Sequence, residues 1–83
     1  MDIQKEFEKL HNEIQNKFAE GISTIIRHIN DKDKIVDFLK KMENQPTEEV
    51  LKRINKIAII KEDYETCEAL KEYATFRKIN LLN

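Results

Sequence analysis

Apolar residues recur at intervals of three and four along almost the whole chain, and no stretch alternates apolar with polar residues. The 83 residues include one glycine and one proline. Spacing of three and four gathers apolar side chains on one face of an α-helix, whereas half-buried strands alternate. The pattern therefore predicts an all-α protein with a single domain over residues 1–83. We expect a small four-helix bundle, or helical hairpins, with a long first helix.

The longest pattern predicts an amphipathic helix over residues 2–29. Its apolar positions read as one stripe: Ile3, Phe7, Leu10, Ile14, Phe18, Ile22, Ile25 and Ile29. The stripe could pack wholly within the bundle, or the long helix could outreach its neighbours and pair with another copy or another protein. We expect a bundle that also self-associates. The consecutive steps of four from Ile14 to Phe18 to Ile22 break a strict heptad and argue against a long left-handed coiled coil.

Two further segments follow the long helix. A short helix is expected over residues 33–43, and a helical hairpin over residues 48–79. Pro46 separates them, because a residue that precedes proline is pushed away from helical angles. Thr47 and Asp63 are the expected N-caps of the two hairpin helices, since their side-chain oxygens can accept from free backbone amides.

Charge and cysteine content narrow the class of protein. Residues 1–45 carry eight basic and nine acidic side chains, and residues 46–83 carry seven of each. A duplex-DNA binder usually concentrates basic residues to neutralise phosphates, so nucleic acid is not the expected partner. With Cys67 as the only cysteine, no disulfide can form within the chain, and no signal-peptide pattern or long apolar run is present. We expect a cytoplasmic protein without a membrane span.

No combination of residues predicts catalysis, a cofactor or a metal. His11 is expected to face solvent, and His28 lies near a helix C-terminus, where it is suited to capping. Cys67 lies on the inner face of the last helix and is interpreted as a buried small hydrophobe. Asp31 and Asp33 resemble the start of a calcium loop, but the glycine and glutamate that such a loop requires are absent. An enzyme is not expected.

The segment from Ala58 to Glu72, AIIKEDYETCEALKE, resembles the UVR-type helical hairpin. In that family an aromatic residue follows an acidic turn, with a small residue and a leucine–basic–acidic ending further along. The positions that match are Tyr64, Glu65, Cys67, Leu70, Lys71 and Glu72, while Glu68 stands where the family prefers a second small residue. The resemblance implies a protein-docking surface on the exposed edge of the hairpin, because the family docks excision-repair subunits and serves as small adaptors.

In size and composition the chain also resembles the small regulatory proteins of T-even-type phages, which include accessory inhibitors of lysis and blockers of host enzymes. We therefore expect a non-catalytic regulatory or adaptor protein that binds a protein target through a helical face. The aromatic candidates for that contact are Phe7, Phe18, Tyr64, Tyr73 and Phe76, since aromatic residues often dominate interface energetics. The alternative is a nucleic-acid-associated regulator of transcription or repair, with phosphate contacts from Lys71, Arg77 and Lys78.

Overall fold

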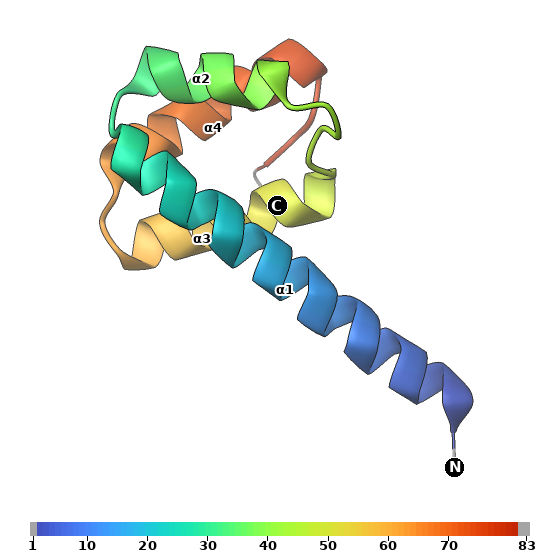
Figure 1. Ribbon diagram of the computed structural model, residues 1–83. Helices are drawn as coiled ribbons and strands as arrows, with labels where there is room; N and C mark the ends of the chain where they lie inside the picture. Colours follow the sequence, from blue (N-terminus) through green and yellow to red (C-terminus); the bar gives the residue numbers. More distant parts are fainter. Residues whose placement is uncertain (1, 82–83) are drawn as a thin grey trace.

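In the computed structural model, residues 2–81 are described, and they form four α-helices without a strand (Figure 1). These helices are α1 (Ile3–Ile29), α2 (Lys32–Lys41), α3 (Glu48–Ile60) and α4 (Tyr64–Arg77). The predicted all-α class is confirmed. Helix α1 continues through Gly21 without interruption, and no glycine has a positive φ angle.

A side-chain oxygen caps the start of each helix, which explains where the helices begin. Asp31 accepts from the amide of Lys34 at 3.0 Å, Thr47 from that of Val50 at 3.2 Å, and Asp63 from that of Thr66 at 3.2 Å. Asp2 does the same for α1. Each bond satisfies one of the amides that the first helical turn leaves free. The N-caps predicted at Thr47 and Asp63 are confirmed.

The core lies between the C-terminal half of α1 and the other three helices. Helix α1 packs on α3, α2 packs on α4, and α3 and α4 form a hairpin. Every helix contributes fully buried side chains, among them Ile26, Ile35, Leu39, Leu51, Ile54, Leu70 and Tyr73. We call this packed part of the molecule the body.

The N-terminal half of α1 extends beyond the body (Figure 1). All side chains of residues 3–14 are exposed, and we call this segment the arm. A helix of 27 residues is roughly 40 Å long. The molecule measures 47 × 26 × 25 Å, so the projecting helix accounts for its elongated shape. The arm is the feature that distinguishes this fold from a compact four-helix bundle.

Candidate protein-binding surface on α1

Helix α1 has two apolar faces, and only one of them packs on the body. The inner face is buried and consists of Ala19, Ile22, Ser23 and Ile26. Of the stripe predicted from the sequence, Ile22 belongs to this face and Ile29 is half-buried. The other six positions are exposed and lie roughly 120° around the helix from the inner face, at about 100° per residue. The eight positions share one side of α1, within an arc of about 120°, but the body covers only Ile22 and part of Ile29.

The exposed apolar positions of α1 form what we call the outer stripe. Their exposed fractions are Ile3 67%, Phe7 68%, Leu10 53%, Ile14 57%, Phe18 44% and Ile25 49%. These values are far from the burial expected of large apolar side chains. Contiguous apolar patches of this kind on soluble proteins usually mark an interaction surface.

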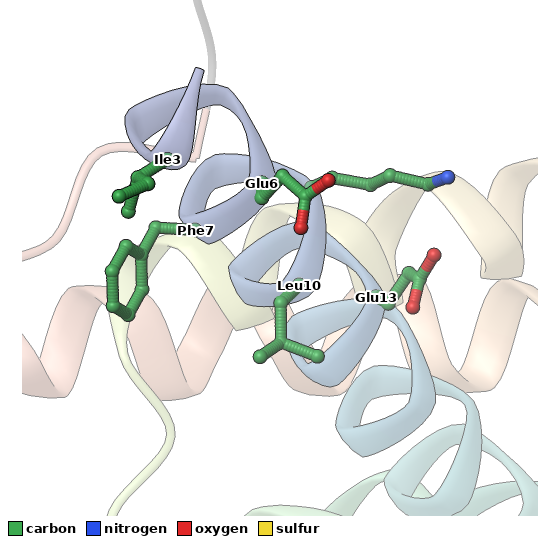
Figure 2. Close-up of a pocket in the computed structure, with 6 residues that line it drawn as sticks. Ile3, Glu6, Phe7, Leu10 and Glu13 are labelled. Atoms are coloured by element: carbon green, nitrogen blue, oxygen red, sulfur yellow. The ribbon is translucent and has the colours of Figure 1, made fainter. Parts of the chain in front are cut away.

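Charged side chains border the outer stripe along the arm. Figure 2 shows Ile3 and Phe7 on one side of the helix, with Leu10 further along and the carboxylates of Glu6 and Glu13 extending from the neighbouring side. Together with Lys9, these residues line a shallow surface hollow. An apolar centre with a charged border is the usual anatomy of a protein interface.

Polar contacts from α3 hold the root of the arm. The His11 Nε2 lies 3.4 Å from Glu49 Oε2, and Arg53 Nη2 donates to Asn12 Oδ1 at 3.2 Å. Arg53 also pairs with Glu49 at 2.9 Å. The hydrogen bond with His11, followed by the charge of Arg53, holds the pKa of Glu49 below its usual range. These contacts join the root of the arm to α3 and leave the outer stripe uncovered.

The structure separates the five aromatic candidates. Phe7 and Phe18 lie on the outer stripe, and Tyr64 and Phe76 of α4 are 71% and 60% exposed. The Lys40 ammonium lies over the Phe76 ring, 4.3 Å from its centroid, and so covers part of it. Tyr73 is instead a core residue, because it follows Leu70 by one helical turn on the buried face of α4. Its hydroxyl donates to Gln45 Oε1.

The hairpin places Leu70 in the core, and Cys67, in the first turn of α4, is partly buried. Burial, together with the nearby Asp63 carboxylate, raises the pKa of the Cys67 thiol. Less thiolate is then present at neutral pH than in an exposed cysteine. Three apolar side chains beside the turn between α3 and α4 are exposed: Ile59, Ile60 and Tyr64.

The alternative function, binding of nucleic acid, requires phosphate contacts from three basic residues, and two of these already contact other groups of the protein. Arg77 donates to the carbonyl of Pro46 and lies near the Tyr73 ring. Lys71 is 3.4 Å from Glu68 Oε1, and Lys78 is the left-handed residue that ends α4. A phosphate-binding face would require these cations to point together into solvent, and the contacts of Arg77 direct it toward the body.

Among residues 2–81 there is no group of three or more histidine, cysteine, aspartate or glutamate side chains placed to hold a metal ion. Within the same residues, no helix combines the length and apolar character needed to cross a bilayer. Comparisons with protein-family models, with curated proteins and with solved structures found no match to this chain. Its function must therefore be inferred from its own residues.

Proposed function

We propose that this protein is a non-catalytic regulatory or adaptor protein that acts by helix-mediated binding to protein, with the outer stripe of α1 as its principal binding surface. The observation that carries the proposal is the arm, where Ile3, Phe7, Leu10 and Ile14 are all more than half exposed. The outer stripe runs from there onto the body through Phe18 and Ile25.

The free energy available from this surface suits protein binding. If each of the six large side chains is taken to carry on the order of 180 Å², within the range of about 150–250 Å² for aromatic residues, their exposed fractions leave on the order of 600 Å² open to solvent. At about 25 cal/mol per Å², complete burial contributes on the order of 15 kcal/mol before the costs of association. Those costs are roughly 4–15 kcal/mol. The stripe can therefore support an interface of moderate affinity, and polar contacts at its border set the specificity.

Two resemblances support the same manner of action. The UVR-type hairpin and the small phage regulators both belong to proteins that work by contacting other proteins. In this chain the exposed Ile59, Ile60 and Tyr64 at the α3–α4 turn give the hairpin an apolar end suited to docking. We assign this end of the hairpin as a second, smaller protein-binding surface.

Photo-crosslinking tests the proposal directly. A benzoylphenylalanine in place of Leu10 puts the reactive group on the outer stripe, and the same group in place of Lys5 puts it on the opposite side of the arm. Both positions are exposed, so neither substitution should disturb the core. We expect adducts with protein, a second copy of the chain included, at position 10 and few at position 5. Equal yields at the two positions, or none, would refute the outer stripe as a binding surface.

A further inference from the structure

We propose that the outer stripe binds the outer stripe of a second copy of this chain, with the two α1 helices antiparallel and centred on Ile14. The inference rests on the proposed function of the outer stripe as a protein-binding surface and names its occupant. Three features of α1 support it: the spacing of the stripe, the position of Gly21, and the exposed area.

The six residues of the outer stripe, together with the exposed Gly21, have the same spacing in both directions along α1. With the exposed Gly21 included, the stripe occupies positions 3, 7, 10, 14, 18, 21 and 25, and its steps are 4, 3, 4, 4, 3 and 4. A two-fold symmetric interface uses the same patch on both copies. An antiparallel pair centred on Ile14 therefore matches every position, with Ile3 opposite Ile25 and Leu10 opposite Phe18.

The average step also suits two nearly straight helices. The six steps from position 3 to position 25 add up to 22, which is about 3.67 residues per step. This value is close to the 3.6 residues of a helical turn, so the stripe stays on one side of α1 along its whole length. The break in the heptad that argues against a long left-handed coiled coil is thus compatible with this shorter pairing.

Gly21 supplies space for the largest side chain of the arm. It lies on the outer side of α1, and a Cβ atom built there would meet nothing within 4 Å. In the antiparallel pair Phe7 of one copy faces Gly21 of the other. Because Gly21 has no side chain, the Phe7 ring can pack directly on the backbone there. A parallel pair would set Phe7 against Phe7 and Gly21 against Gly21, which crowds one layer and leaves a void in another.

The area and the position of the body are also compatible with a dimer. With on the order of 600 Å² from each copy, the pair buries at most roughly 1,200 Å², at the lower end of specific interfaces. The inner face that carries the body lies roughly 120° from the outer stripe. Each body is therefore displaced from the pairing face and leaves room for the second helix.

Engineered cysteines test the alignment. In a Cys67→Ser background, single variants Ile3→Cys, Ile14→Cys and Ile25→Cys are oxidised alone and in mixtures. We expect Ile14→Cys to form a disulfide with itself, and Ile3→Cys to pair with Ile25→Cys but not with itself. Efficient self-pairing of Ile3→Cys would indicate a parallel arrangement and overturn the proposal. Absence of both expected disulfides would overturn it as well.

A substitution at Gly21 provides the second test. Gly21→Leu fills the space proposed for Phe7 while leaving the monomer core untouched, so the helical circular dichroism spectrum should persist. We expect the dissociation constant of the dimer to rise roughly tenfold or more, as overpacking of an interface does. The matched control Asn16→Leu, on the other side of α1, should leave it unchanged. Equal dissociation constants for wild type and Gly21→Leu would refute the Phe7–Gly21 contact and with it this alignment.

The outcomes also separate this inference from the proposed function. If the chain forms no disulfides in the cysteine test but gives photo-adducts with other proteins at position 10, the self-pairing is wrong and the outer stripe remains a protein-binding surface. If neither disulfides nor adducts form, both proposals are wrong.

Discussion

Tyr64 and Tyr73 have the same side chain and opposite surroundings. Tyr64 is 71% exposed at the start of α4, whereas Tyr73 is fully buried and its hydroxyl donates to Gln45. Tyr73→Phe should therefore lower the free energy of unfolding by about 0.5–1.5 kcal/mol, the usual net contribution of one hydrogen bond. Urea denaturation measures this value. Tyr64→Phe is the control and should change it by less than ~0.5 kcal/mol. Equal effects of the two substitutions would contradict the placement of Tyr73.

His11 and Glu49 link the arm to α3, and their contact is visible in the titration of the carboxylate. Because the hydrogen bond with His11 is the main cause of the lowered pKa of Glu49, His11→Ala should raise that pKa toward its ordinary value. Carboxyl-detected NMR across a pH series measures the change. Lys52→Ala, which removes the partner of Glu48, is the control and should leave the Glu49 pKa unchanged.

The same contact has a defined effect on stability. A carboxyl whose pKa is lower in the folded state than in the unfolded state stabilises the fold above its unfolded-state pKa. That contribution is lost as the pH falls through the folded-state pKa. A Glu49 pKa that does not respond to His11→Ala would show that the root of the arm is not held as described.

At the scale of helices, α1 and α4 each present a leucine that tests which surfaces are packed. Leu70 of α4 is fully buried, whereas Leu10 of α1 is 53% exposed. Leu70→Ala should lower the free energy of unfolding by about 2–5 kcal/mol, because it removes buried contacts and leaves a cavity. Leu10→Ala, measured in dilute protein, should lower it by less than ~0.5 kcal/mol. A small effect of Leu70→Ala would contradict the packing of α4 in the core.

The local signals in the sequence were sufficient to predict the helices. Spacing of three and four predicts an all-α chain, and Thr47 and Asp63 are recognisable as N-caps because capping depends on a few neighbouring residues. The helix predicted at residues 33–43 occupies Lys32–Lys41 instead. Helix ends of this kind fray and depend on packing, which a single sequence does not display.

The division of α1 into two faces could not be predicted in the same way. Spacing of three and four links Ile22 equally well to Phe18 and Ile25 on the outer stripe and to Ile26 on the inner face. Ala19 and Ser23 are small or polar, so the inner face carries a weak apolar signal although all of its residues are buried. The location of the body alone decides which face is covered. The sequence also does not show which face of α4 is covered. It therefore places the buried Tyr73 among the candidate contacts together with Phe7 and Phe18.

At the scale of the whole molecule, the arm and the hairpin end have separate roles in the proposed dimer. The outer stripe is used for pairing, while the exposed Ile59, Ile60 and Tyr64 remain available on each copy. A dimer then presents two identical docking ends. A target that contacts both ends at once gains avidity without any new kind of contact. Pairing and target binding would thus use different faces of the same small fold.

Light scattering across a dilution series is the most direct test of pairing through the outer stripe. The chain has a mass of 9.9 kDa. We expect twice that mass at high concentration, falling toward the monomer on dilution, because the buried area lies at the lower end for specific interfaces. The double variant Phe7→Glu/Leu10→Glu should keep its helical spectrum and remain at 9.9 kDa throughout. A wild-type mass of 9.9 kDa at every concentration, or a dimer that the double variant leaves intact, would contradict pairing through the outer stripe.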